Sequence, residues 1–126
     1  MNAIEQAINK PLVLSDKKIA VFLIDFNQYK SEELIQYLSH AERERADRLK
    51  IKLKKEQFIL TRSFLRRLLA NSLTKGHQEI SFSYGEHGKP FINDLYHGQT
   101  VEFNISHSGH YGLIAITLKN KVGVDI

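Results

Sequence analysis

The order of apolar patterns predicts an α+β fold in which helices pack on one face of a mainly antiparallel sheet. The run from Ile19 to Phe26 is rich in residues that favour strands, which predicts one buried strand near the start. Helical spacing dominates the middle of the 126-residue chain. Alternating patterns separated by turn residues dominate the last third. A strand, several helices and then a run of strands is the order typical of a two-layer domain.

Two short helices are expected first. The segment from Ser31 to Leu38 predicts a helix that begins at Ser31. Ser39 precedes Glu42 by three residues, which is the spacing of a capping box and predicts a second helix to about Leu49.

A longer helix is predicted from Lys54 to Leu73, with Gly76 as its stop signal. Its large apolar residues recur near the 3.6-residue period and are expected in the core: Phe58, Leu65, Leu68, Leu69 and Leu73.

The strand-rich part begins after Gly76. Strands are predicted at Ile80–Tyr84, Val101–Ile105, Tyr111–Leu118 and Val122–Ile126, with a turn at Gly85–Pro90. Domains more often end in a polar, frayed tail than in an apolar strand. This ending suggests that the sequence has been cut, or that the strand continues into a second lobe.

Composition excludes several classes of protein. There are no cysteines, so disulfides and thiolate metal sites are excluded and a cytosolic setting is expected. No apolar run reaches the length of about 18 residues that a membrane-spanning helix needs. The net charge is +4, and basic residues crowd the segment from Arg43 to Lys55. That cluster indicates either a solvated helix face or an anionic partner: nucleic acid, a phosphorylated cofactor or an acidic protein.

Three short segments in the last third carry chemistry. In the first, Gly88 permits an unusual turn and Pro90 favours an extended Lys89, whose amine could then meet a phosphate. In the third, Asp125 is the lone acid in an apolar strand. A carboxylate there is costly unless it is paired, hydrogen-bonded or bound to a metal, and its hard oxygens suit magnesium.

The second segment reads Phe-Asn-Ile-Ser-His-Ser from Phe103 and is predicted as a strand that runs into a polar loop. Ser106 and His107 can donate hydrogen bonds to phosphate oxygens. A nucleophilic serine with His107 as its base is disfavoured because adjacent extended residues point to opposite faces. Zinc at His107 and His110 is disfavoured by the intervening Ser-Gly. Four other histidines are expected at the surface: His40, His77, His87 and His97.

Together these segments resemble those of the Sfp-type 4'-phosphopantetheinyl transferases. That family carries a Gly-x-Pro segment, then Phe-Asn-x-Ser-His-Ser, then Gly-(Val/Ile)-Asp-(Ile/Val)-Glu. Here they read GKPF from Gly88, FNISHS from Phe103 and GVDI from Gly123. The helices of residues 39–49 and 58–70 also resemble the family's basic and arginine-bearing helices. The resemblance covers about residues 18–126.

The resemblance implies an enzyme that moves phosphopantetheine from coenzyme A to a serine of an acyl or peptidyl carrier protein. Family members fold as two similar lobes with coenzyme A in the cleft between them. By this resemblance, Ser106 and His107 contact the coenzyme A phosphates and Lys89 reaches the same region. Arg45 and Arg62 are candidates for the adenosine and 3'-phosphate end, where a planar guanidinium suits two oxygens.

The resemblance also makes Asp125 a magnesium ligand. The family's following Glu and its Trp-x-x-Lys-Glu helix have no counterpart, since the sequence stops at Ile126 and contains no Trp. The expectation is one N-terminal lobe over residues 1–126, without the C-terminal lobe and inactive alone. The lobe is also expected to self-associate through the face that a second lobe would cover.

Two alternatives remain. One is a nucleic-acid-binding module that uses the basic helices, although residues 43–55 hold no aromatic side chain for base stacking. The other is a non-catalytic interaction domain. Neither nucleic acid nor a membrane is the expected partner.

Overall fold

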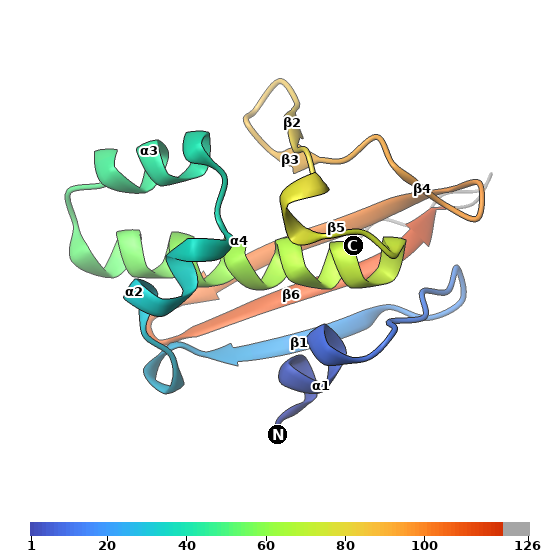
Figure 1. Cartoon of the computed structure of the whole chain (residues 1–126), viewed down its shortest axis with the longest axis horizontal. Helices are drawn as coiled ribbons and strands as arrows, with labels where there is room; N and C mark the ends of the chain where they lie inside the picture. The colour runs from blue at the N-terminus through green and yellow to red at the C-terminus, as the bar shows by residue number, and fades with distance from the viewer. Residues whose placement is uncertain (120–126) are drawn as a thin grey trace.

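The computed structural model describes residues 1–119 (Figure 1). The α-helices are α1 (Ala3–Asn9), α2 (Ser31–Leu34), α3 (His40–Arg48) and α4 (Lys52–Leu73). The strands are β1 (Ala20–Asp25), β2 (Ser83–Tyr84), β3 (Pro90–Phe91), β4 (Leu95–Tyr96), β5 (Gln99–Ser108) and β6 (Tyr111–Lys119). Three single-turn 3₁₀ helices connect them: η1 (Phe26–Gln28), η2 (Ile35–Tyr37) and η3 (His77–Glu79).

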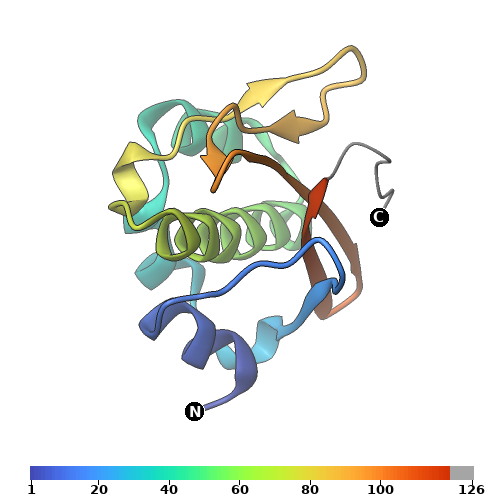
Figure 2. The same cartoon turned by 90° about the vertical axis from the view of Figure 1, so that its right-hand side faces the viewer.

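The main sheet has the strand order β1-β6-β5-β4, and every pairing in it is antiparallel. The strands β2 and β3 form a separate two-stranded hairpin. Figure 2 shows the helices gathered on one side of β1, β6 and β5, which confirms the predicted fold class. Among the described residues, no helix is long and apolar enough to cross a membrane.

Helix α4 forms the centre of the hydrophobic core. Its Leu65, Leu68 and Leu69 are fully buried, as the helical spacing predicts. They belong to the same apolar cluster as Ile114 and Ile116, which point inward from alternate positions of β6. Two other predicted core residues, Phe58 and Leu73, are only half-buried.

The other face of the sheet carries exposed apolar side chains. Val21 and Leu23 of β1 are each 57% exposed, and Leu113 of β6 is 43% exposed. Leu23 lies opposite Leu113 in the register, and Tyr111 at the start of β6 is also exposed. We call these four residues the outer apolar patch.

The residues that cap the helices match the sequence prediction for α3 but not for α4. The capping box at Ser39 and Glu42 is present, with both of its reciprocal hydrogen bonds. The predicted end of the long helix at Leu73 is confirmed, but the residue that closes α4 is Thr74, in the left-handed conformation at φ 57°, and not Gly76. Helix α1, capped by the Asn2 side chain, was not predicted.

Two strand predictions also differ from the structure. The predicted strand from Ile80 is reduced to Ser83–Tyr84, since the Ile80 carbonyl accepts a hydrogen bond from Arg66 instead of a neighbouring strand. The polar loop predicted after Ile105 is a continuation of β5 to Ser108. The turn is a two-residue loop that begins at Gly109, whose φ of 58° suits such hairpins. The predicted strand Val122–Ile126 lies outside the described residues.

Candidate functional site

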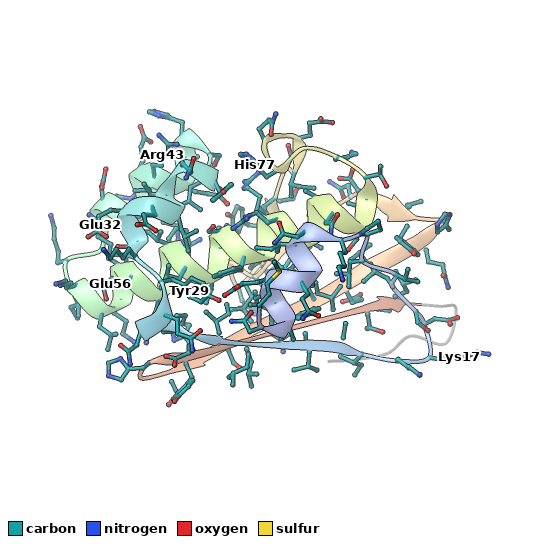
Figure 3. The ribbon with its side chains drawn as sticks, turned by 60° about the horizontal axis from the view of Figure 1, so that its bottom comes forward. Lys17, Tyr29, Glu32, Arg43, Glu56 and His77 are labelled. Carbon is teal, nitrogen blue, oxygen red and sulfur yellow. The ribbon has the colours of Figure 1, made fainter. Side chains whose placement is uncertain are left out.

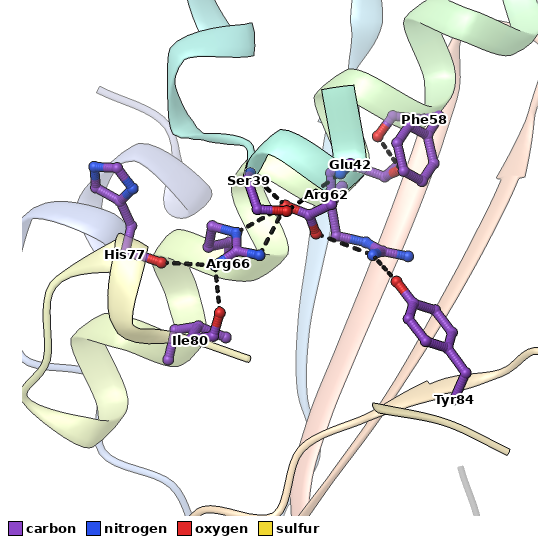
Figure 4. Close-up of polar contacts among 9 residues, drawn as sticks. Ser39, Glu42, Phe58, Arg62, Arg66, His77, Ile80 and Tyr84 are labelled. Atoms are coloured by element: carbon purple, nitrogen blue, oxygen red, sulfur yellow. Dashed lines mark hydrogen bonds and ion pairs between the residues drawn. The ribbon is translucent and has the colours of Figure 1, made fainter. Parts of the chain in front are cut away.

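A buried carboxylate joins α3, α4 and the β2–β3 hairpin. Glu42 of α3 accepts hydrogen bonds from the Ser39 backbone N–H at 2.8 Å, from Arg62 Nη1 at 3.0 Å and from Arg66 Nη2 at 2.7 Å (Figure 4). Arg62 Nη1 also donates to the Tyr84 hydroxyl of β2 at 2.8 Å. The network therefore fixes the positions of α3 and the β2–β3 hairpin relative to α4.

All three charged side chains of this network are almost inaccessible, with 3–5% of each exposed. Burial alone would raise the pKa of Glu42. The hydrogen bond from the Ser39 backbone and the charges of Arg66 and Arg62 outweigh burial and hold that pKa below its ordinary value. Glu42 is therefore ionised at neutral pH and neutralises part of the buried positive charge.

Aromatic rings surround Arg62 and the neighbouring Arg45. The Arg62 guanidinium lies 5.0 Å from the Phe58 ring centroid and 4.8 Å from that of Phe82. Arg45 lies over Phe58 at 4.9 Å and within 6.0 Å of the Tyr84 ring centroid. Arg45 is exposed and forms no ion pair within residues 1–119. Of the two arginines predicted at the site, Arg45 is open to a ligand, whereas Arg62 is engaged inside the protein.

Arg45 lies at a cavity of about 580 Å³ between α3, η3 and β2. Arg48, Tyr37, Phe82 and Tyr84 also line this cavity, and Glu42 and Arg66 contribute to its wall. Its volume is that of a typical small-molecule site, and its lining combines aromatic rings with positive charge. We call it the α3 cavity.

Lys89 is exposed on the β2–β3 hairpin. The turn is closed by a hydrogen bond of 3.0 Å from the Gly85 N–H to the Lys89 carbonyl, and Gly88 takes a φ of 75°. Because Tyr84 at the base of the hairpin is bonded to Arg62, the buried network also orients the loop that carries Lys89. Lys89 lines a separate cavity of about 310 Å³ between the hairpin and β5.

Ser106 and His107 lie next to each other near the end of β5, so their side chains point to opposite faces of the sheet. Ser106 is paired with Leu113 on the outer face, and His107 is paired with the inward-facing Gly112. Gln57 of α4 donates a hydrogen bond of 2.9 Å to the Gly109 carbonyl and holds the following turn against the helix. The structure therefore places His107, but not the Ser106 hydroxyl, on the face that α4 covers.

No group of three His, Cys, Asp or Glu side chains that could hold a metal ion occurs within residues 1–119. The predicted magnesium ligand Asp125 lies outside the described residues.

Sequence reasoning missed the central role of Glu42. Its Ser-x-x-Glu spacing was interpreted as a helix cap, and this is correct, but the same carboxylate also neutralises Arg62 and Arg66 from the next helix. The prediction that His77 is exposed was wrong: its ring is half-buried and packs edge-on against Tyr37, with centroids 5.0 Å apart.

Comparisons with known proteins identify a common family. Residues 25–119 match the family model described as the N-terminal region of 4'-phosphopantetheinyl transferase. A Synechocystis protein that carries the name of this enzyme is 38% identical over 89 residues, which is 71% of this chain and 36% of the relative. The transferase Sfp of Bacillus subtilis is 30% identical over 79% of this chain and 43% of its own length. The chain thus spans less than half the length of these relatives.

Among solved structures, the fold is similar to Helicobacter pylori holo-[acyl-carrier-protein] synthase, a complex with coenzyme A. The TM-score is 0.56 and the identity 15%, and the match covers 80% of this chain and 99% of the synthase chain. The fold of this chain therefore corresponds to one lobe of that enzyme class. With the family-model match over residues 25–119, this shows that the chain belongs to the 4'-phosphopantetheinyl transferase family, of which it represents the N-terminal region.

Proposed function

We propose that this chain is the coenzyme A-binding lobe of a cytosolic transferase that moves phosphopantetheine from coenzyme A to a serine of a carrier protein. In this reaction the serine oxygen bonds to the phosphorus of the phosphopantetheine arm, and adenosine 3',5'-bisphosphate leaves. The observation that carries the proposal is the α3 cavity, where the unpaired Arg45 and two tyrosines line a space of nucleotide size. The family match and the coenzyme A complex of the structural neighbour support it.

We assign a role to each basic side chain from its exposure to solvent. Arg45 holds the 3'-phosphate, since its guanidinium is exposed and backed by Phe58. Arg62 supports this site from beneath by fixing Tyr84, instead of touching the phosphate itself. Lys89 and His107 are exposed on neighbouring elements and serve the pyrophosphate. Ser106 lies on the opposite face of β5, and its hydroxyl contacts a ligand that extends around the end of this strand.

Two further parts of the proposal concern residues and partners beyond the described lobe. Asp125 is proposed to hold the magnesium ion, which would offset charge on the pyrophosphate when bound. The exposed basic residues of the segment from Arg43 to Lys55 are proposed to face an acidic surface of the carrier protein. The 126 residues alone are expected to label an apo-carrier protein negligibly, because the resemblance implies two further acidic metal ligands and a base that are not among them.

Titration calorimetry of the 126-residue chain tests the binding role. We expect saturable heat with coenzyme A, and competition by adenosine 3',5'-bisphosphate. A single-stranded oligonucleotide titrated at several salt concentrations is the comparison ligand. Oligonucleotide binding with a steep salt dependence, and no heat with coenzyme A, would favour a nucleic-acid-binding module instead. No heat with either would favour a non-catalytic interaction domain.

Self-association through the outer apolar patch is the second expected property of the isolated chain. Contiguous exposed apolar surface seldom stays uncovered, and Leu23 and Leu113 lie opposite each other at its centre. Light scattering should show dimers or larger species in the micromolar range, and L113E should shift them to monomer. V13E is the matched control, because Val13 is 78% exposed and lies outside the sheet. A wild-type chain that stays monomeric over this range would contradict the prediction.

A further inference from the structure

A further cavity lies between α1, the last turns of α4 and η3, and it shares His77 with the α3 cavity. Its volume is about 170 Å³. Helix α1 packs against α4 (Figure 3), and His77 is the first residue of η3, which also contacts α4. The lining residues are Ile8, Arg67, Ala70, Asn71, Lys75 and His77, so no carboxylate contributes to its wall. We call it the Arg67 cavity.

Arg67 differs from its two neighbours on α4 in having no anionic partner. Arg62 and Arg66 share the Glu42 carboxylate. Arg67 is half-buried, yet within residues 1–119 its guanidinium forms neither an ion pair nor a hydrogen bond. Its closest compensation is the Tyr37 ring, whose centroid lies 4.0 Å from Cζ. Within the described residues, none of its N–H donors is therefore paired with a protein acceptor.

Desolvation of this charge has an energetic cost that a ligand could remove. Burial lowers the pKa of Arg67 below its ordinary value, because water is withdrawn from the charged form, and the nearby Tyr37 and Tyr29 hydroxyls offset this only in part. A buried charge is ordinarily paired. An oxyanion beside the guanidinium would supply the missing acceptors.

The other polar groups of the cavity define what it can accept. Lys75 is paired with Asp94, and the Asn71 amide donates to the carbonyls of Ala7 and Lys10. His77 Nδ1 is buried and has no hydrogen-bond partner. The cavity therefore offers the unpaired guanidinium of Arg67 beside the His77 ring, and no carboxylate is among its lining residues.

We propose that the Arg67 cavity binds a single phosphate group, held by the Arg67 guanidinium fork with His77 as a second donor. A guanidinium fork matches two phosphate oxygens at once. The volume is less than a third of that of the α3 cavity, so it suits a phosphate group and excludes a nucleotide. The site adjoins the α3 cavity at His77, but Arg67 lines only the smaller cavity, so this proposal does not depend on coenzyme A binding.

Site-resolved NMR of the ¹⁵N-labelled 126-residue chain tests this proposal. Inorganic phosphate is added at constant ionic strength, with chloride as the matched anion. We expect a saturable shift of the Arg67 Nε–H and His77 ring signals that chloride does not produce. R67Q should weaken this binding at least about tenfold, as expected for the loss of a charge-assisted contact. R67K should weaken it less, because it keeps the charge and loses only the fork.

The controls separate this site from the proposed coenzyme A site. In R45A, the Arg67 and His77 response to phosphate should persist, whatever the outcome of the coenzyme A titration. Backbone spectra show whether each variant is folded, and the wild-type titration needs no variant at all. Tighter binding of glycerol 3-phosphate than of free phosphate would identify a phosphate ester as the ligand, and the reverse would identify the free ion. Shifts that rise linearly without saturation, or that chloride reproduces, would overturn the proposal.

Discussion

Replacing Glu42 with alanine is expected to destabilise the lobe by about 3–5 kcal/mol, because it leaves two buried guanidinium groups without their counter-charge. Glu42 is the carboxylate that bonds both Arg62 and Arg66, and all three side chains are nearly inaccessible to solvent. Small domains have a total stability of about 5–15 kcal/mol, so this change removes a large part of it. Urea denaturation followed by circular dichroism measures the difference.

The matched control is E44A, one position before Arg45 on the same helix. Glu44 is 57% exposed and pairs with His40 at the surface, so its removal should change stability by less than about 1 kcal/mol. A change for E42A as small as the one for E44A would contradict a central role for the buried network.

The depressed pKa of Glu42 should make the folding stability of the lobe depend on pH. The folded-state pKa of Glu42 is depressed, so its contribution is fully present above the ordinary glutamate pKa of about 4.3 and is lost as pH falls through the folded-state value. The stability difference between wild type and E42A should therefore be largest near neutral pH and shrink in acid. A difference that is constant from neutral pH to pH 3 would contradict this assignment.

The sequence predicted the fold well where local signals and tertiary packing agree. The strand at β1, the capping box at Ser39 and the long helix α4 were found because apolar spacing and cap residues act over a few positions. The prediction that this strand is buried was wrong for one face, since Val21 and Leu23 are exposed. The length of β5 was underestimated, since the polar Ser106 and His107 were interpreted as loop residues. They continue the strand because β6 supplies their hydrogen-bond partners, and pairing with a later segment cannot be inferred from the polarity of these residues.

The candidate site was only partly predictable for a similar reason. Residue type and motif order selected Arg45, Lys89 and His107, all of which are exposed. Which of Arg45 and Arg62 is free to bind a ligand could not be predicted, because both are arginines at helical positions of a basic region. Only the packing of α3 on α4 shows that Glu42 binds Arg62 and leaves Arg45 open. The unpaired state of Arg67 likewise depends on three-dimensional neighbours.

Because Arg45 is exposed and, within residues 1–119, unpaired, its removal should have a large effect on coenzyme A affinity. R45A should weaken coenzyme A binding by roughly ten- to a hundredfold, since hydrogen bonds to charged groups contribute about 1.5–3 kcal/mol. Dephospho-coenzyme A lacks the 3'-phosphate and should bind wild type and R45A with affinities that differ by less than about threefold. Titration calorimetry of both proteins with both ligands gives the coupling between this side chain and that phosphate.

R43A is the matched control for this cycle. Arg43 lies on the same helix and carries the same charge, but its guanidinium donates to the Gln36 carbonyl at 3.3 Å and it does not line the α3 cavity. Its removal tests whether general positive charge on α3 is sufficient. Equal losses of affinity for both ligands in R45A, or a loss in R43A as large as in R45A, would mean that Arg45 does not recognise the 3'-phosphate. A loss confined to R45A and to the phosphorylated ligand would assign the α3 cavity to the nucleotide end, because only a direct contact distinguishes two ligands that differ by one phosphate.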